Sequence, residues 1–245
     1  TSKNIQIQSS AEKLYLKEIK KHPSLSNYGI VIVFGGDGLF LSASKIAYLL
    51  DIPILGINFG KIGFLVDVDK KDIIKKVHEI LKGSYITDKR IMIDGKVTDN
   101  NLKTISSTSL NDIVIYNHGL LKMIKSKIFI NDFLINIQRS DGVIVSTPTG
   151  STAYSMSNGC PIVSPAADVI SITPISPHTY SDRPIIINSS DNIRIEIENK
   201  SIKNTVVTFD GANNLNVSCP KVIEIKKSRK NLFIAHPSDY NYFKI

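Results

Sequence analysis

The sequence has only two cysteines and no long apolar run, and both absences limit what the protein can be. Cys160 and Cys219 are too few for a disulfide framework and are not spaced like a metal site, so we expect both to be reduced and structural. The apolar runs, of which 30–34 is typical, are far shorter than the roughly 20 residues that a membrane-spanning helix needs. We therefore expect no membrane partner.

A targeting signal and a concentrated charge patch are also missing. Residues 1–22 lack the basic, apolar and small-residue blocks of a signal peptide, so we expect a cytoplasmic protein. The 30 Lys and Arg exceed the 22 Asp and Glu, and a net charge of +8 would suit an anionic ligand. Because the positive charges are scattered along the chain, however, we expect no nucleic-acid partner.

The first part of the chain alternates helical and strand patterns. Short apolar strands are expected at 30–34 and 54–57, and helices at 11–21, 39–50 and within 70–84. Continuous apolar strands of this kind are typical of a parallel sheet that is covered on both faces. This part therefore indicates an α/β domain.

Beyond residue 85 the pattern changes to short β-rich runs separated by turn residues. Two pairs are expected to form hairpin turns because they tolerate positive φ, namely Asn131-Asp132 and Asp94-Gly95. We expect a β-sandwich or a curved sheet here, interrupted by a helical stretch after Gly150.

The 245 residues could form one large domain or two of moderate size, and the change of pattern favours two. We expect an α/β domain over 1–88 and a mostly-β domain over 89–228. The tail, 229–245, is expected to return to the first domain and pack on it.

The sequence Gly-Gly-Asp-Gly at 35–38 lies between an expected strand and an expected helix. Gly35, Gly36 and Gly38 would let a ligand approach the backbone, and the free amides of the turn would attract phosphate. The carboxylate of Asp37 would lie at the carboxyl end of a parallel strand, where open α/β sheets bind ligands. Alternatively, Asp37 caps the helix, and these residues alone leave both interpretations open.

A second unusual stretch, 139–165, is rich in Ser, Thr, Pro and Gly. It could be a plain loop, but it presents hydroxyls and amides beside an aromatic ring, Tyr154, and this combination suits a base and a ribose. Arg139 and Asp141, just upstream, add a guanidinium for phosphate and a carboxylate for hydroxyls.

Taken together, these blocks resemble the NAD kinase family. They are GGDG (35–38), GINFGKIGFL (56–65), LNDIVI (110–115), DGVIVSTPTGSTAYS (141–155), SPHTYSDRPI (176–185) and FDG (209–211). A lone GGDG is shared with diacylglycerol kinases, sphingosine kinases and 6-phosphofructokinases. The long PTGSTAYS block is far more specific.

The resemblance implies an enzyme that uses ATP, or polyphosphate in some members, to phosphorylate the 2′-hydroxyl of the adenosine ribose of NAD. It implies that Asp37 is the catalytic base, since an unassisted ribose hydroxyl is a poor nucleophile. No carboxylate cluster suggests a metal cage, so we expect Mg²⁺ to arrive with the phosphates of ATP. Family members are commonly homo-oligomers, and we expect a tetramer or a dimer.

The same motif matching implies a set of nucleotide-binding residues. It assigns the adenosine part of NAD to Asn111 and Asp112, and a pocket wall to Phe64. It also assigns base, ribose, carboxamide or phosphate contacts to Gly35, Gly36, Gly38, Arg139, Asp141, Thr149, Thr152, Ala153, Tyr154, Ser157 and Asp210.

The sequence departs from the usual family text in three ways. Leu39 replaces a threonine, Asp112 replaces a glutamate, and no strand pattern precedes the first helix. Two other functions stay open, a lipid kinase that shares the GGDG turn and a dinucleotide-binding regulator without turnover. The hydroxyl-rich stretch argues against the first and Asp37 against the second. We expect His178 to be structural.

Overall fold

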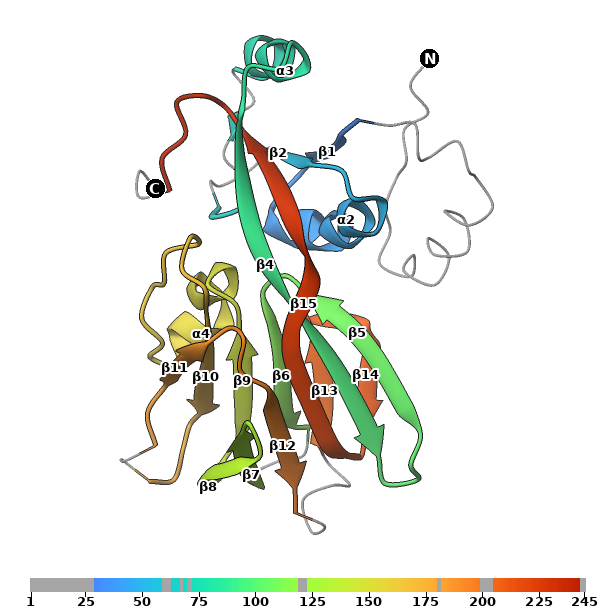
Figure 1. Ribbon diagram of the computed structural model, residues 1–245, viewed down its shortest axis with the longest axis vertical. Helices are drawn as coiled ribbons and strands as arrows, with labels where there is room; N and C mark the ends of the chain where they lie inside the picture. Colours follow the sequence, from blue (N-terminus) through green and yellow to red (C-terminus); the bar gives the residue numbers. More distant parts are fainter. Residues whose placement is uncertain are drawn as a thin grey trace. The chain divides into compact units, whose positions relative to one another are not determined.

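The computed structural model describes residues 29–58, 63–66, 68–69, 72–118, 123–179, 182–198 and 205–242. The chain divides into two compact units. One consists of Thr1–Arg90 and Asn231–Ile245, and the other of Ile91–Lys230 (Figure 1). The helix expected over 11–21 lies outside the described residues.

The first unit contains a short parallel sheet and two helices. Strand β2 pairs in parallel with β1 on one side and with β3 on the other. The elements are β1 (Val31–Phe34), α2 (Asp37–Leu50), β2 (Ile54–Asn58), β3 (Val68–Asp69) and α3 (Ile73–Leu81).

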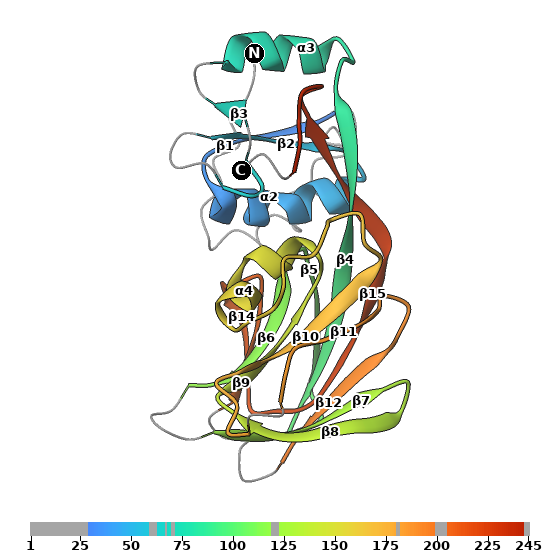
Figure 2. The same ribbon diagram turned by 90° about the vertical axis from the view of Figure 1, so that its left-hand side faces the viewer.

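The two helices cover opposite faces of this sheet (Figure 2). Val77 and Ile80 of α3 pack in one core cluster with Leu55 and Ile57 of β2. Helix α2 buries Phe40 and two alanines on its own inner side. The prediction of an α/β arrangement with a covered parallel sheet is therefore confirmed.

The tail of the chain also belongs to the first unit. Strand β15 (Pro220–His236) ends there, and its Ile234 pairs in parallel with Ile54 of β2. The expectation that the tail returns to the α/β part of the chain is confirmed.

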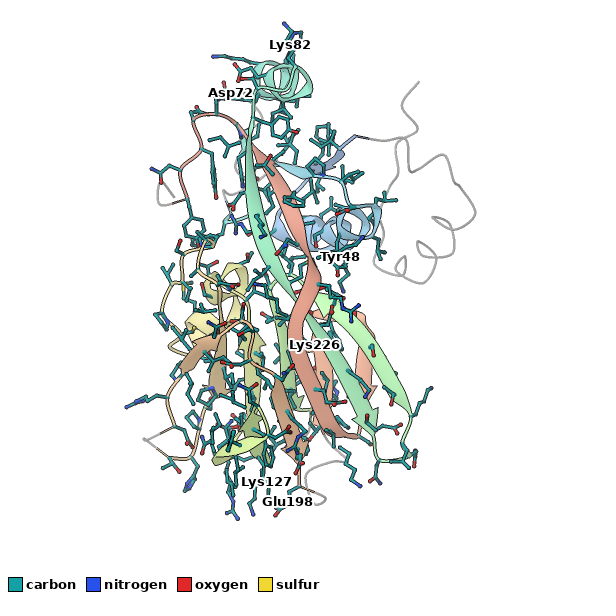
Figure 3. The ribbon with its side chains drawn as sticks, viewed as in Figure 1. Tyr48, Asp72, Lys82, Lys127, Glu198 and Lys226 are labelled. Atoms are coloured by element: carbon teal, nitrogen blue, oxygen red, sulfur yellow. The ribbon has the colours of Figure 1, made fainter. Side chains whose placement is uncertain are left out.

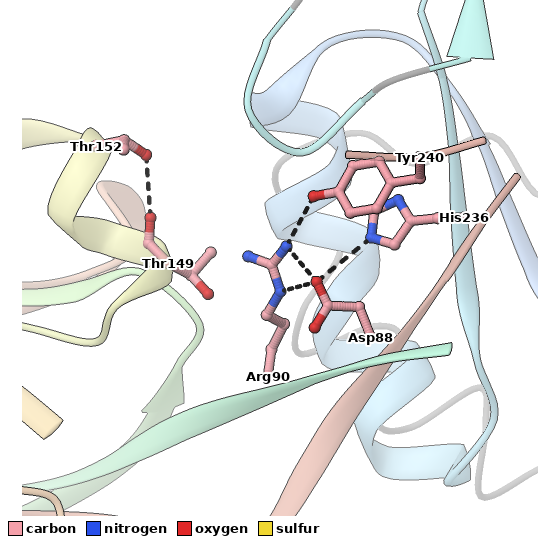
Figure 4. Close-up of polar contacts among 6 residues, drawn as sticks. All are labelled: Asp88, Arg90, Thr149, Thr152, His236 and Tyr240. Atoms are coloured by element: carbon pink, nitrogen blue, oxygen red, sulfur yellow. Dashed lines mark hydrogen bonds and ion pairs between the residues drawn. The ribbon is translucent and has the colours of Figure 1, made fainter. Parts of the chain in front are cut away.

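A buried polar cluster holds this tail within the first unit (Figure 4). Arg90 is only 1% exposed, and its Nε donates a hydrogen bond to Oδ2 of Asp88 at 2.9 Å. Arg90 Nη2 lies 2.7 Å from the same oxygen and 3.3 Å from the Tyr240 hydroxyl. The Tyr240 ring stacks on His236 with the ring centroids 3.6 Å apart. Asp88 and Arg90, which precede the tail, thus contact His236 and Tyr240 within it.

The second unit is a β-sandwich. Its two sheets bury one continuous core, to which Ile93, Ile128, Ile195 and Ile223 contribute from one sheet and Ile113, Val145, Ile172 and Phe209 from the other. The strand order is β5-β4-β15-β12-β7-β8 in one sheet and β11-β10-β9-β6-β13-β14 in the other. The prediction of a mostly-β second part is therefore confirmed.

The elements of this part have the following bounds. The strands are β4 (Ile86–Asp99), β5 (Thr104–Ser109), β6 (Asp112–Asn117), β7 (Ile124–Ile130), β8 (Phe133–Ser140), β9 (Gly142–Ser146), β10 (Val169–Ile175), β11 (Ile185–Asn188), β12 (Ile193–Ile197), β13 (Thr205–Phe209) and β14 (Ala212–Ser218). The helical stretch expected after Gly150 is present as two short helices, η2 (Thr149–Thr152) and α4 (Tyr154–Ser157).

One of the two predicted hairpin turns is confirmed. Asn131 and Asp132 connect β7 to β8, and both have positive φ, 48° and 67°. Asn and Asp tolerate this conformation better than other non-glycine residues, as the prediction assumed.

The other predicted hairpin turn is wrong, because Asp94 and Gly95 lie inside strand β4. The turn that leads into β5 comes later, near Leu102, which has a φ of 64°. Gly95 is needed for space: a β-carbon there would lie 2.6 Å from Cδ1 of Ile113 and 2.7 Å from the ring of Phe209. The glycine therefore permits close packing of the two sheets.

The charged side chains that Figure 3 labels lie on the outside of the two units. Asp72 and Lys82 flank helix α3, and Lys127 and Glu198 are exposed on the second unit. In the described ranges, no helix is both long enough and apolar enough to cross a membrane.

Candidate active site

The glycine-rich turn joins strand β1 to helix α2. Gly36 is the N-cap of α2, with an extended backbone, and no side chain caps the helix. Asp37 is the first helical residue, so its carboxylate is not a cap. Of the two interpretations that the sequence left open, helix capping by Asp37 is wrong.

The carboxylate of Asp37 instead turns toward a neighbouring loop. Oδ2 accepts a hydrogen bond from the backbone N–H of Phe64 at 3.2 Å, and Oδ1 accepts one from Leu65 at 3.4 Å. Burial raises the pKa of the Asp37 carboxyl above its ordinary value, while these two amides partly oppose that rise. A carboxylate whose pKa is raised is a better proton acceptor than one with the ordinary value.

Gly63 makes this arrangement possible. A β-carbon on Gly63 would lie 2.4 Å from Oδ1 and 2.5 Å from Oδ2 of Asp37. Carbon and oxygen cannot approach so closely, so any larger residue would displace the carboxylate. Sequence reasoning did not single out Gly63, although its position in the GINFGKIGFL block was a signal.

Leu39, where the sequence departs from the family pattern, packs on the glycine turn. A β-carbon on Gly35 would lie 2.9 Å from Cδ2 of Leu39 and 3.4 Å from its Cβ. The leucine therefore covers Gly35 with an apolar surface.

A second group of predicted residues meets in the β-sandwich, where β5 leads into β6. The carboxylate of Asp210 accepts hydrogen bonds from three consecutive backbone N–H groups: Leu110 at 3.0 Å, Asn111 at 2.7 Å and Asp112 at 3.2 Å. In return, the N–H of Asp210 donates to the carbonyl oxygen of Asp112 at 3.0 Å. Asp210 thus binds the whole 110–112 segment.

The turn that follows strand β9 packs against the same segment. Thr147 donates its N–H to the carbonyl oxygen of Asn111 at 2.9 Å and its hydroxyl to that of Leu110 at 2.6 Å. A β-carbon on Gly150 would lie 2.1 Å from the Asn111 oxygen, so only glycine fits there. Thr147 was not predicted as a site residue, although it lies inside the DGVIVSTPTGSTAYS block.

Several hydroxyls of this stretch point inward, which differs from the expectation that they face a ligand. Ser155 Oγ donates to Ser146 Oγ at 2.9 Å, and Ser146 in turn shares a 2.7 Å hydrogen bond with Ser171. Ser151 Oγ donates to the Pro148 carbonyl oxygen at 2.6 Å. These serines hold the turn in shape because buried hydroxyls need partners.

Asn111 and Asp112 are the buried polar groups of this junction. Asn111 is 8% exposed, and its Oδ1 has no hydrogen-bond partner among the residues that the structure describes. Burial, with the nearby charge of Asp210 as a second cause, raises the pKa of the Asp112 carboxyl to about 7. An acceptor without a partner and a carboxyl that titrates near neutrality are both typical of ligand-binding sites.

Five other predicted residues lie on the two short helices or at their junction. Thr149 and Thr152 are buried, and the Thr152 hydroxyl donates to the Thr149 carbonyl oxygen at 3.2 Å (Figure 4). Tyr154 and Ser157 lie on α4 and are exposed, and Ala153 connects η2 to α4.

Arg139 and Asp141 are not brought together with this group. Both are exposed. Arg139 lies near the end of strand β8 and Asp141 directly precedes strand β9, whereas Thr147 follows the end of β9. The six residue steps from Asp141 to Thr147 span about 20 Å at about 3.3 Å per strand residue. Each of the two residues uses its backbone for structure: the Arg139 carbonyl accepts the His178 N–H, and Asp141 donates its N–H to Ile175.

Within the described ranges, no group of three or more His, Cys, Asp or Glu side chains could hold a metal ion. Asp112 and Asp210 are the acidic pair of the β-sandwich site, but Asp210 already accepts three amides.

Comparison with protein families matches both parts of the chain. Residues 4–85 match the ATP-NAD kinase N-terminal domain, and residues 110–236 match the ATP-NAD kinase C-terminal domain. The chain is 40% identical to the NAD kinase of Blochmanniella floridana over 215 residues, which is 88% of this chain and 73% of the relative. It is 36% identical to an NAD kinase of Escherichia coli over 240 residues, or 96% and 82% of the two chains.

Two solved structures are similar as well. Yeast NADH kinase complexed with NADH superposes with a TM-score of 0.79 at 26% identity, covering 88% of this chain and 64% of the yeast chain. An NAD kinase from Archaeoglobus fulgidus in complex with ATP gives a TM-score of 0.71 at 22% identity, covering 91% and 88%. The second similarity concerns the fold alone.

Proposed function

This chain belongs to the NAD kinase family, and from that premise we propose that it transfers the terminal phosphoryl group of ATP, or of polyphosphate, to the 2′-hydroxyl of the adenosine ribose of NAD, giving NADP. The protein is accordingly a phosphotransferase. The observation that carries the proposal is the carboxylate of Asp37, which is partly buried and held by two backbone amides at the start of helix α2.

In the proposed reaction, Asp37 accepts the proton of the 2′-hydroxyl as the hydroxyl oxygen attacks the γ-phosphorus. The new oxygen–phosphorus bond forms while the bond to the β–γ bridging oxygen breaks, and ADP leaves. A positioned base contributes about 10²- to 10⁴-fold to such a step. Positioning and charge neutralisation provide most of the remaining acceleration in phosphoryl transfer.

The raised pKa of Asp37 supports this role, because a base is most effective when its pKa lies near the working pH. The amides of Phe64 and Leu65 support it by fixing the direction of the carboxylate. We assign Phe64 to the pocket wall, and Gly35, Gly36 and Gly38 to the approach of the phosphates.

The adenosine and nicotinamide parts of NAD are assigned to the β-sandwich. Asn111 offers an unpartnered carbonyl oxygen to an amino group, and Asp112 offers a carboxyl to a ribose hydroxyl. The exposed ring of Tyr154 offers a stacking surface. The remaining proposed contacts are Thr149, Thr152, Ala153 and Ser157. Asp210 belongs to the same junction, whereas Arg139 and Asp141 lie near the other end of strand β9.

We propose that Mg²⁺ or another divalent cation enters with ATP, as part of the nucleotide substrate. This is consistent with the chemistry of Mg²⁺, which commonly takes phosphate oxygens and water alongside one or two carboxylates. We further propose a homo-oligomer, a tetramer or a dimer, in the cytoplasm, with domains at 1–88 and 89–228 and the tail, 229–245, on the first domain.

The test is an assay of the purified protein with NAD, ATP and Mg²⁺, followed by a coupled measurement of NADP. We expect Asp37→Asn to lower kcat about 10²- to 10⁴-fold while the Kd for NAD, measured by calorimetry, changes little. Asp51→Asn is a matched control, since Asp51 is exposed at the other end of helix α2. Near-normal turnover by Asp37→Asn would exclude Asp37 as the base.

The same assay addresses the regulator that binds a dinucleotide without turnover. That function requires NAD binding with no NADP formed under any donor, including polyphosphate. The lipid-kinase alternative is set aside by membership of the NAD kinase family.

A further inference from the structure

Leu110 and Asn111 lie between strands β5 and β6, and Asp112 is the first residue of β6. Groups outside these strands must therefore hold much of the backbone of the segment 110–112. Three of its N–H groups converge on one carboxylate, that of Asp210. Two of its carbonyl oxygens accept hydrogen bonds from Thr147. A third, that of Asp112, accepts the N–H of Asp210.

Asp210 can make these contacts because of its own backbone. It has a φ of 52°, in the left-handed region, at the turn between β13 and β14. That conformation allows both its carboxylate and its N–H to face the 110–112 segment. Asp and Asn adopt it at lower cost than other residues with a β-carbon.

The side chains that this segment carries are the ones assigned to adenosine. Asn111 is 92% buried, since 8% of its surface is exposed, and its Oδ1 has no partner within the described part of the chain. Asp112 is 5% exposed. Within the described ranges, neither side chain is oriented by a hydrogen bond of its own, so the backbone beneath them sets their direction.

We propose that Asp210 is a positioning residue whose carboxylate fixes the backbone of 110–112, and through it the direction of the Asn111 amide and the Asp112 carboxyl toward the adenosine of NAD. This inference rests on the proposed function of the site. It assigns Asp210 an indirect role in place of a nucleotide contact, because both of its carboxylate oxygens are engaged by backbone amides.

Two substitutions distinguish the effect of the Asp210 carboxylate from the effect of the positive φ at this position. Asp210→Gly tolerates the positive φ and removes all three acceptor contacts. Asp210→Asn also tolerates the φ and keeps one acceptor oxygen, so it should rescue part of the function. We expect the KM for NAD to rise about 10- to 100-fold in Asp210→Gly and less in Asp210→Asn, with the KM for ATP unchanged within about twofold.

The matched controls are Asp132→Gly and Asp132→Asn. Asp132 also has a positive φ, 67°, and lies in a β-turn of the same unit, but it is exposed and far along the chain from 110–112. Both controls should keep the KM for NAD of the unsubstituted protein. An equal rise in the controls would attribute the effect to the backbone alone and overturn the proposal.

A double-mutant cycle tests whether Asp210 acts through Asn111. If it does, adding Asp210→Gly to Asn111→Ala should weaken NAD binding much less than Asp210→Gly does in the unsubstituted protein. Fully additive effects would show that the two residues act independently, and would overturn the proposal. So would failure of both Asp210 variants to fold, because Asp210 would then be required for the fold itself.

Failure of this inference is distinguishable from failure of the proposed function. Absence of NADP formation by the unsubstituted protein would refute the function, whereas the cycle is read from the Kd for NAD by calorimetry and does not need turnover. Absence of any NAD binding would refute both.

Discussion

Gly63 leaves free the space that the carboxylate of Asp37 occupies: a β-carbon on Gly63 would lie 2.4 Å from Oδ1 of Asp37. The two residues are 26 positions apart in the sequence. The next two residues, Phe64 and Leu65, donate their N–H groups to the same carboxylate. Gly63 thus leaves room for the Asp37 carboxylate, and the N–H groups of Phe64 and Leu65 fix its direction.

Gly63→Ala should push the Asp37 carboxylate away from both amides. We expect kcat to fall at least about 10-fold, because misplacing a reacting group by about 1 Å is costly. Gly29→Ala is the control, since a β-carbon on Gly29 meets no atom within 4 Å. Equal kcat values for the two variants, measured by the coupled NADP assay, would contradict this view of Gly63.

Leu39 and Gly35 should be energetically coupled, since the leucine lies where a side chain on Gly35 would project. We expect Gly35→Ala to lower the free energy of unfolding by about 1 kcal/mol, from overpacking. In the Leu39→Ala background the same change should cost less. Urea denaturation of the four proteins measures the coupling, and additive costs would show that the contact has no energetic weight.

Asp112 should make stability depend on pH. Its pKa of about 7 when folded exceeds the ordinary value of 3.8, so between these values the folded protein binds more protons than the unfolded one. The free energy of unfolding should therefore fall as pH rises from 4 to 7, with the full penalty present above 7. Asp112→Asn should remove that penalty. Its gain in the free energy of unfolding over the parent should be about 3 kcal/mol larger at pH 8 than at pH 5.

Urea denaturation at several pH values between 5 and 8 checks this prediction. Asp132→Asn, at an exposed carboxylate, is the control and should leave the pH profile unchanged. If the Asp112→Asn and parent profiles run parallel, Asp112 does not titrate in this range.

Arg90 should be essential for the stability of the buried cluster in the first unit. Arg90→Met removes the guanidinium that pairs with the partly buried Asp88 carboxylate and leaves His236 Nε2, 3.7 Å away, beside it. Removing one partner of a buried ion pair costs about 3–5 kcal/mol. Arg90→Met combined with Asp88→Leu should recover much of that loss, because both charged members of the pair are then replaced by apolar side chains. Urea denaturation measures both. A double variant no more stable than the single one would show that the cost comes from lost packing.

Local patterns were sufficient for much of the fold. The positions of α3 and of the first two strands follow from apolar spacing, and the turn at Asn131-Asp132 follows from the φ that these residues tolerate. At Gly95 the same reasoning failed, because the glycine serves contacts with Ile113 and Phe209 that are distant in sequence. The sequence alone does not tell whether a glycine is needed for a turn or for close packing, because the residues that pack against it are distant in the sequence.

The sequence by itself determined that this is an α/β part followed by a β-rich part. Its motifs identified the family and singled out Asp37 as the proposed base. It determined these because periodicity and turn chemistry are local, and because a long motif is specific. Only the tertiary structure decided which side chains contact one another across the sequence. It placed Gly63 under Asp37, directed the serines of the hydroxyl-rich stretch inward, and set Asp210 against 110–112. Those relations join residues up to 100 positions apart, and only folding brings them together.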